Sequence, residues 1–519
     1  MGRPASVIVV GSGAAGLAAA LAATHAGASV TLVERATSLG GTTAISGGVA
    51  WLPASHVARA AGVRDSPAEA LQYLRSLALG DYDDTLASTF VHDAARVASM
   101  IEDRTPLCWE LLANWPDYHA ERPGGRTGGR SIWPRPLELP AEIALRVQSS
   151  PEVSARDAAP SADAGRLTDG LVLRGPVRGR VLVGAMVAAL VERGVPVRTR
   201  ARAMELIMED GGVRGVVVDG DELRGNVVLA TGGFQFDAAL VRTFIPGNGL
   251  APMGTPGCAG DGLRMALAAG AELGNMTEAW WMPAVGIPGE VLDDERFYRP
   301  LHVERARPGA ILVDRCGRRF VNEAQNYGDV GRALRLRFDA GGFRFPASPC
   351  WLVFDAEYRS RYPIGSLEPG DPHPPWLRSA ATLTDLAAEL QLPEGELEST
   401  VARFNAGVAE GVDTEFGRGS YGYDHWIGDA TASHPTLGPV TRPPFYAVEV
   451  RSGCLGTKGG PRTDTEGRVR RADDGIVVGL YAAGNAAANP FGVATPAGGA
   501  TIGPALVFGT RAGEAAAGD

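Results

Sequence analysis

Residues 6–34 read SVIVVGSGAAGLAAALAATHAGASVTLVE, and this stretch decides the fold. Residues 6–10 and 29–33 are short runs of mostly β-branched residues, which is typical of buried parallel strands. The alanine-rich residues 17–25 between them predict a helix. The stretch is therefore a β-α-β unit, and it predicts an α/β fold of the Rossmann-like type with a parallel sheet.

The turn between the first strand and the helix has the pattern G-x-G-x-x-G, with Gly11, Gly13 and Gly16 at its fixed positions. In such a turn the first glycine permits the tight bend. The second lets backbone N–H groups approach a pyrophosphate at the helix N-terminus, and the third lets the helix pack against the strand. Glu34 follows the glycines at about the 20-residue spacing of an acid that binds ribose hydroxyls. The unit predicts a dinucleotide site, although the pattern alone fits a merely tight turn equally well.

Three more stretches combine strand-like residues or hydroxyls with glycines, namely 40–48 (GGTTAISGG), 226–233 (NVVLATGG) and 479–485 (GLYAAGN). Glycine lets a backbone lie close to a planar ligand, and a flexible loop is the simpler explanation for any one of them. Because they are far apart in the chain, together they indicate one long ligand that is contacted from several places.

Composition excludes several classes of protein. The 519 residues are 45% hydrophobic and 21% charged, which is ordinary for a folded globular chain. The net charge of −10 disfavours nucleic acid and anionic membrane surfaces as partners. No stretch approaches the roughly 18 apolar residues of a membrane span.

Cysteine and histidine residues give no sign of a metal or a disulfide. The five cysteines are odd in number and never form a C-x-x-C pair, and the eight histidines show no metal-ligand spacing. The histidines, His302 among them, are expected to be scattered surface or core residues. The N-terminus lacks the basic region and cleavage site of an export signal. We therefore expect a cytoplasmic protein without a metal site.

The middle of the chain differs from its two ends. Residues 279–443 are richer in aromatic residues and proline, and they include a predicted helical segment at 380–408. We expect a Rossmann-like domain built from residues 1–278 and 444–519, with an inserted α+β capping domain between them. The Ala, Ser and Asp-rich residues 150–180 predict a surface loop.

The order of several motifs resembles the flavoproteins that include 3-ketosteroid Δ1-dehydrogenases and fumarate reductases, over nearly the whole chain. The motifs are G-x-G-x-x-G, GGTTAISGG, ATGGF at 230–234, GDG at 260–262, RRFVNEAQNY at 318–327, GTKGG at 456–460, and GLYAAGN followed by PAGGATIGPALVFG at 496–509. The resemblance implies that FAD is the long ligand and lies where the two domains meet.

The resemblance also implies which residues contact FAD. Ala14 and Ala15 are expected at the pyrophosphate, Glu34 at the ribose and Ala203 at the adenine. The full set is Gly11, Gly13, Ala14, Ala15, Gly16, Glu34, Arg35, Gly41, Thr42, Thr43, Ser46, Gly47, Gly48, Ala203, Thr231, Gly232, Asp261, Gly484, Asn485, Thr501 and Ile502. Respiratory members attach the flavin through a histidine where this chain has Gly41, so non-covalent FAD is expected.

The helix predicted from residue 501 has Pro504 in its first turn, and its N-terminus carries a positive partial charge. Directed at the flavin, this end would stabilise negative charge on the reduced ring. Lys458 of GTKGG is expected near the flavin by the same resemblance, and the sequence assigns it no catalytic role.

Two positions separate the branches of this family. Fumarate-type reductases have a proton-donating arginine four residues after the glutamate of F-V-N-E and a histidine before the threonine of the later T-x-G-G motif. This chain has Tyr327 and Gly456 there. The ketosteroid dehydrogenases have a tyrosine at the first position, and it removes the proton next to a ketone. Tyr327 matches that base.

Tyr118, in the segment WPDYHAERPGG, resembles the tyrosine that assists this base. An unperturbed phenol titrates near about 10, so Tyr327 needs help from Tyr118 or from a cation such as Arg305 or Arg307. The dehydrogenases carry Y-P-G-A-G near the C-terminus to polarise the substrate carbonyl, whereas this chain has TPAGG at 495–499. Gly499 keeps the backbone donor, and Thr495 either replaces the phenol or indicates a different substrate.

The implied activity is desaturation of a cyclic ketone, a steroid or a smaller ring, with a quinone, oxygen or another protein as the electron acceptor. One alternative is a flavin-dependent reductase of an enone or, fumarate-type, of a dicarboxylate. Another is a flavoprotein whose active site has decayed and which only binds other molecules.

Overall fold

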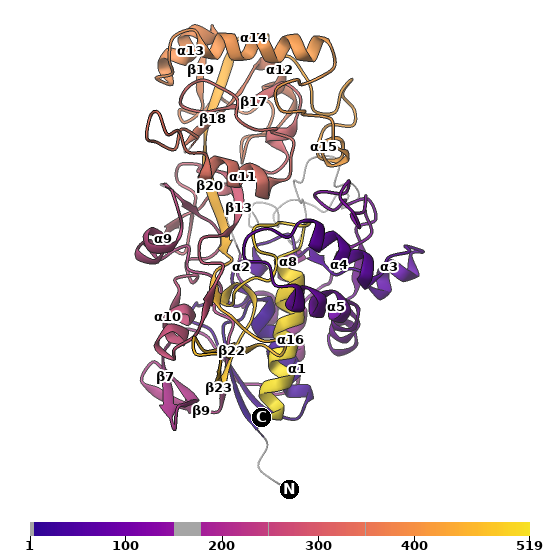
Figure 1. Cartoon of the computed structure of the whole chain (residues 1–519), viewed down its shortest axis with the longest axis vertical. Coiled ribbons are helices and arrows are strands. Elements are labelled where there is room, and N and C mark those ends of the chain that lie inside the picture. Colours follow the sequence, from indigo (N-terminus) through magenta and orange to yellow (C-terminus); the bar gives the residue numbers. More distant parts are fainter. Residues whose placement is uncertain (1–4, 150–177, 248, 348) are drawn as a thin grey trace.

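The computed structural model describes residues 5–149, 178–247, 249–347 and 349–519. Figure 1 shows an elongated molecule, with the strands β22 and β23 and the helices α1 and α16 in its lower half and the helices α12, α13 and α14 at its upper end. The C-terminus lies at the lower end, close to the predicted first domain. Most of the loop predicted at 150–180 falls outside the described residues.

The first large sheet confirms the predicted β-α-β unit. It has six strands in the order β22-β23-β10-β1-β2-β6, in which β1 pairs in parallel with both β2 and β10. Its strands are β1 (Ser6–Val10), β2 (Ser29–Val33), β6 (Val197–Arg198), β10 (Asn226–Leu229), β22 (Arg468–Arg470) and β23 (Ile476–Ala482). Strands from both ends of the chain thus share one sheet, because β10 and β23 pair in parallel.

Side chains of β1 alternate between two apolar layers, as the period of a strand requires. Val7 and Val9 join the core of the helix layer, while Ile8 and Val10 join the core on the opposite face. The helix layer contains α1 (Ala14–His25), α8 (Arg178–Glu192) and α16 (Ile502–Gly518). The other face carries the antiparallel sheet of β7 (Ala203–Glu209), β8 (Gly212–Val218) and β9 (Asp221–Arg224). The sheet is therefore buried on both faces.

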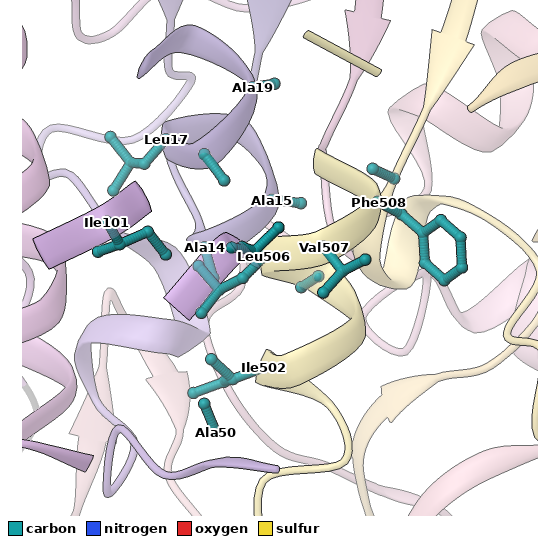
Figure 2. Close-up of a cluster of buried hydrophobic side chains, with 14 of the residues drawn as sticks. Ala14, Ala15, Leu17, Ala19, Ala50, Ile101, Ile502, Leu506, Val507 and Phe508 are labelled. Atoms are coloured by element: carbon teal, nitrogen blue, oxygen red, sulfur yellow. The ribbon is translucent and has the colours of Figure 1, made fainter. Parts of the chain in front are cut away.

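Helices α1 and α16 pack closely because small residues face each other. A Cβ atom at Gly509 would lie 2.3 Å from the Ala15 carbonyl oxygen, and one at Gly513 would lie 2.2 Å from that of Ala19. Figure 2 shows Leu506 and Val507 of α16 beside this face of α1. This contact fixes the N-terminus of α16 relative to the first glycine turn.

The second large sheet has seven strands, with the path β16-β13-β20-β18-β17 and with β11 and β19 paired to β20. Its strands are β11 (Ala251–Pro252), β13 (Ala279–Val285), β16 (Arg299–Pro300), β17 (Ala310–Val313), β18 (Cys350–Phe354), β19 (Arg378–Ala380) and β20 (Phe445–Thr457). The long strand β20 begins just after the expected boundary at residue 443 and still belongs to this sheet. The division at 278 and 443 stays a prediction.

Shorter elements connect and cover the two sheets. In the first half they are α2 (Gly41–Ala44), β3 (Ala50–Trp51), α3 (His56–Ala60), α4 (Pro67–Ser76), α5 (Asp84–Arg104), β4 (Trp109–Leu111), β5 (Ser131–Pro134), α6 (Ala141–Ala144), α9 (Ala238–Phe244) and α10 (Asp261–Ala268). Later ones are β12 (Leu273–Gly274), β14 (Val291–Leu292), β15 (Glu295–Arg296), η1 (Glu304–Ala306), α11 (Tyr327–Leu336), α12 (Ala356–Arg361), α15 (Gly422–Ile427), β21 (Gly460–Pro461) and η2 (Gly484–Ala486).

The helical segment predicted over residues 380–408 is not one continuous helix. The chain forms β19, then α13 (Leu383–Glu389), then α14 (Glu396–Ala409). Gln391 has a positive φ of 57°, and Pro393 follows it. Proline cannot donate a helical hydrogen bond, so the helix ends before it. None of the helices in the described parts of the chain is long and apolar enough to span a membrane.

Candidate active site

A cavity lies where the carboxyl ends of the parallel strands meet the second sheet. Val10, Val33 and Ala230, at the ends of β1, β2 and β10, line one part of it, and Tyr327 at the start of α11 lines another. In open parallel sheets ligands bind outside the carboxyl ends of the strands. The cavity therefore joins the predicted dinucleotide site to the predicted base.

Nearly all of the residues predicted to contact FAD line this cavity. The exception is Gly16, where an added Cβ atom would lie 1.8 Å from the Gly11 carbonyl oxygen. Gly16 thus serves the packing of helix on strand. Gly11 has a φ of 105°, and its Cβ would lie 2.3 Å from the Ala230 carbonyl oxygen. The turn is closed to any side chain at both positions.

Other residues that line the cavity leave free space or an unpaired polar group, which a large ligand could occupy or bond. A Cβ atom at Gly41 would meet nothing nearer than the Thr255 hydroxyl at 3.8 Å. The Thr231 hydroxyl is buried and has no hydrogen-bond partner among the described residues. An open glycine and an unpaired hydroxyl on the same wall fit a bound FAD, which would fill the first and bond to the second.

Charged residues gather at the end of the cavity near β2. Glu34 accepts hydrogen bonds from the Ser12 amide at 3.0 Å and hydroxyl at 2.6 Å, and its other oxygen accepts from the Ala36 amide at 2.9 Å. Asp261 pairs with Arg35 at 2.9 Å and with Arg202 at 2.7 Å. These contacts hold both carboxylates in fixed orientations, as a polar, hydroxyl-bearing ligand requires.

Two helices direct their N-termini at the cavity. Ala14 begins α1, and its amide donates to the Thr43 hydroxyl at 3.1 Å. Thr501 and Ile502 begin α16 and line the cavity, and Thr501 makes no side-chain cap. Free N–H groups and the helix dipole favour negative charge at both places.

Tyr118 and Tyr327 form the predicted pair at the other end of the cavity. Their ring centroids are 5.3 Å apart with an interplanar angle of 76°. Burial raises the pKa of Tyr327 and outweighs the neighbouring Tyr118 hydroxyl and the charge of Arg305, which both lower it. Tyr423 lies against Tyr118 at 5.0 Å, so the pair belongs to a buried group of three phenols.

Arg305 is the cation behind these phenols. It is completely buried, and its Nη1 donates to the backbone carbonyls of Glu323 and Gln325, just before Tyr327. Its Nε and Nη2 have no partner within the described ranges. Arg307 instead donates to the Gly428 carbonyl at 2.7 Å. Of the two arginines considered from the sequence, Arg305 is the one tied to the segment that carries the base.

The sequence-based interpretation of His302 is wrong, because this residue lines the cavity with its ring centroid 5.3 Å from that of Tyr327. Burial, with Arg305 and Arg307 nearby, lowers the pKa of His302 to about 3. Its imidazole is therefore neutral at physiological pH. Its Nε2 has no hydrogen-bond partner among the residues described.

The 495–499 loop brings Gly499, but not Thr495, to the cavity wall. The Gly498 carbonyl accepts from the Ser131 hydroxyl at 2.9 Å. Because a trans peptide directs its C=O and the next N–H to opposite sides, the Gly499 N–H points away from Ser131. It has no acceptor in the described parts of the chain. Thr495 instead packs on Gly328, where an added Cβ atom would lie 2.6 Å from its hydroxyl.

Apolar residues that the sequence did not single out complete this end of the cavity. They are Val49, Trp115, Trp133, Met253, Met282, Phe297, Tyr298, Pro300 and Leu455. The rise in aromatic residues and proline after residue 279 was the available signal, but it does not separate a cavity wall from a core. Aromatic and apolar walls with few polar groups are typical of sites for apolar small molecules.

Fold and cavity together define an FAD-binding oxidoreductase, and comparison with known proteins supports this class. The FAD binding domain family model matches residues 6–502. A 4-oxocyclohexanecarboxylate 2-dehydrogenase of Sinomonas cyclohexanicum is 38% identical, with 100% of this chain and 94% of that protein covered. A 3-oxosteroid 1-dehydrogenase of Mycolicibacterium smegmatis is 36% identical over 98% of this chain and 96% of the relative.

A solved structure agrees over the whole chain. The 3-ketosteroid Δ1-dehydrogenase of Sterolibacterium denitrificans, in complex with 1,4-androstadiene-3,17-dione, has a TM-score of 0.90 and 30% identity and covers 99% of both chains. The chain belongs to the FAD-binding flavoprotein family that contains these ketone dehydrogenases. It is an FAD-dependent oxidoreductase.

Proposed function

We propose that this protein desaturates a cyclic ketone at the bond next to its carbonyl group. The observation that carries the proposal is that Tyr327, Tyr118 and Gly499 line the same cavity. The names of its relatives support two substrate classes, namely 3-oxosteroids and cyclohexanones. Tyrosine replaces the proton-donating arginine of fumarate-type reductases, which disfavours a dicarboxylate substrate.

The chain's own groups divide the chemistry between them. The Gly499 N–H donates to the ketone oxygen and stabilises the negative charge that develops there as the α carbon loses its proton. Tyr327 accepts that proton, with the Tyr118 hydroxyl as its neighbour. FAD, when bound, supplies the acceptor for the hydride that leaves the β carbon. The apolar wall excludes water, so proton and hydride are not exchanged with solvent during the step.

Residues at the opposite end hold the cofactor in this proposal. When FAD is bound, Glu34 would accept from the ribose hydroxyls, Ala14 and Ala15 would present the α1 N-terminus to the pyrophosphate, and Ala203 would contact the adenine. The N-terminus of α16, at Thr501 and Ile502, would stabilise negative charge on the reduced flavin. Gly41 offers no side chain for attachment, so FAD is bound non-covalently.

Anaerobic mixing of the holoenzyme with a panel of ketones tests the proposal. The panel contains a 3-oxosteroid, 4-oxocyclohexanecarboxylate and unsubstituted cyclohexanone. Bleaching of the flavin band by a ketone, with formation of the matching enone, is expected. Bleaching by a chemical reductant with recovery on adding an enone, and none with any ketone, would establish the reductase instead. No response to either would leave only the binding protein.

A further inference from the structure

Lys458 is the only lysine in the chain, and its side chain is completely buried. It follows the end of β20, in the short connection between β20 and β21. Its ammonium group lies 4.3 Å from the centre of the Trp280 ring. A buried ammonium is costly unless its donors are satisfied, so its contacts indicate what it does.

All three N–H donors of Lys458 go to consecutive backbone carbonyls of one loop. The Nζ atom donates to the oxygens of Gly492 at 3.1 Å, Val493 at 3.0 Å and Ala494 at 2.7 Å. Charge-assisted hydrogen bonds are about twice as strong as neutral ones. The first residues of the loop that leads to Gly499 are therefore held by three hydrogen bonds from one ammonium group. We call these three bonds the Lys458 tripod.

Later carbonyls of the same loop are held in a similar way. The Pro496 oxygen accepts from the Tyr118 amide at 2.9 Å and from the Tyr73 hydroxyl at 2.7 Å. The Gly498 and Gly499 oxygens accept from Ser131 and from the Trp51 amide. The Ser131 contact fixes the Gly498 carbonyl, and the Gly499 N–H of the same peptide is thereby fixed in the opposite direction.

Lys458 also lies beside the elements that carry the proposed base. The charged groups that act on it are Glu278, before β13, and Asp329 and Arg332, both on α11. Asp329 is two residues from Tyr327 and pairs with His119 at 3.1 Å, next to Tyr118. Thr495, one residue after the tripod, packs on Gly328 of α11. The loop, the base and its partner tyrosine thus meet around Lys458.

We propose that Lys458 is a positioning residue: its ammonium group fixes residues 492–499 relative to α11, so that the Gly499 N–H and the Tyr327 hydroxyl act on the same ketone. The proposal rests on the function proposed above for Gly499. It assigns Lys458 no contact with substrate or FAD. It also explains Thr495 as a packing residue between the loop and α11.

The variant Lys458→Met tests this, because methionine fills similar space without donors. Arg335→Met is the matched control. Arg335 is also a buried cation, and it donates to two consecutive carbonyls, those of Pro246 at 2.5 Å and Gly247 at 2.9 Å, near the far end of α11. Amide hydrogen exchange of the holoenzymes, followed by mass spectrometry, reports on residues 492–499 without any need for turnover.

We expect at least 10-fold faster exchange across 492–499 in Lys458→Met, and unchanged exchange there in Arg335→Met. The rate of anaerobic flavin reduction by the ketone should fall about 10- to 100-fold in Lys458→Met with little change in KM, because a misplaced donor loses transition-state stabilisation. Unchanged exchange in a folded Lys458→Met overturns the proposal. If the wild type is not reduced by any ketone, the proposed function fails, while the exchange result still decides the role of Lys458.

A second test uses the wild-type protein, so it does not require that a variant folds. Burial lowers the pKa of Lys458 to about 7. At pH 9 the neutral amine keeps two N–H donors for three carbonyls, so exchange across 492–494, corrected for its intrinsic pH dependence, should be several-fold faster than at pH 6. The loop at Pro246 and Gly247 serves as the internal reference. Equal corrected exchange at both pH values would contradict the tripod.

Discussion

The two ends of the cavity are built by different means. At the end predicted to hold FAD, much of the wall is backbone: Gly41 leaves open space, and the N-termini of α1 and α16 supply N–H groups. At the other end, the proposed chemistry would depend on the side chains of Tyr118 and Tyr327, which are more than 200 residues apart in the chain and whose rings are in contact. The residues predicted to bind FAD are thus encoded largely in local motifs, whereas the proposed reactive groups are brought together by the packing of the two sheets.

FAD binding should be lost completely when a side chain is added at the tight glycine turn. Gly11→Ala places a Cβ atom 2.3 Å from the Ala230 carbonyl oxygen at a φ of 105°. We expect the purified variant to contain no FAD, or not to fold. Flavin absorbance and thermal unfolding measure this.

Gly27→Ala is the control, since Gly27 also has a positive φ, of 89°, but no atom within 4 Å of an added Cβ. That variant should retain FAD and lose only the roughly 1–2 kcal/mol of left-handed strain. Equal FAD content in the two variants would show that the Gly11 turn does not hold the cofactor.

Removal of the proposed base should slow the reaction with the ketone without loss of FAD. Removal of a general base costs about 10²- to 10⁴-fold in rate. Tyr327→Phe should therefore slow anaerobic flavin reduction by that factor while the protein stays yellow. The control Tyr358→Phe removes another buried hydroxyl, which donates to the Glu304 carbonyl at 2.7 Å outside the cavity. Its rate should be unchanged, and a Tyr327→Phe variant as fast as this control would exclude Tyr327 as the base.

Removal of the Arg305 charge should lower the rate of flavin reduction by the ketone less than removal of the Tyr327 hydroxyl does. Arg305 lowers the pKa of Tyr327 against the larger effect of burial. In Arg305→Met that pKa should rise further, so the phenolate fraction at pH 8 falls tenfold for each unit of the rise. We expect reduction about 10- to 100-fold slower at pH 8, with recovery as the pH is raised.

Arg418→Met is the control for Arg305→Met. Arg418 is also fully buried and donates to backbone carbonyls, but its charge is paired with Glu323 at 3.2 Å. Its removal should lower stability without moving the pH profile of flavin reduction. Identical pH profiles for Arg305→Met and the wild type would contradict the assignment of Arg305.

The smallest expected effect concerns the contact that joins the two tyrosine-bearing segments. Burial opposes the charged forms of both partners, but their mutual interaction outweighs it and raises the pKa of His119 above 6.5 and lowers that of Asp329 below 3.8. The His119 contribution is therefore complete below pH 6.5 and is lost as the pH rises through its folded pKa. The Asp329 contribution is lost as the pH falls below 3.8.

Asp329→Asn should thus lower the free energy of unfolding by up to about 1 kcal/mol near pH 6, and by less at pH 9, as denaturant titrations measure. Glu121→Gln, whose carboxylate is 3.8 Å from His119 and half-exposed, is the control and should have a smaller effect. A larger loss at pH 9 than at pH 6 would show that the pair acts in another way.

The β-α-β unit and its glycine turn follow from the amino-acid sequence alone. The alternation in β1, the glycines at 11, 13 and 16, and the acid at 34 act over a few residues, so their roles follow from local backbone geometry. The sequence also indicated Tyr327 through its motif. Pro393 likewise argues in the sequence itself against a continuous helix over residues 380–408.

The surroundings of the remaining site residues depend on the packing of the folded chain. Whether His302 lies in a core or on a cavity, whether Arg305 or Arg307 stands behind Tyr327, and whether Thr495 faces the substrate or Gly328 all depend on contacts between segments far apart in the chain. Burial and the partners of a side chain set its pKa and its orientation, and neither can be calculated from its neighbours in sequence. The contacts of Lys458 could not be predicted either, because its three carbonyl partners lie more than 30 residues further along the chain.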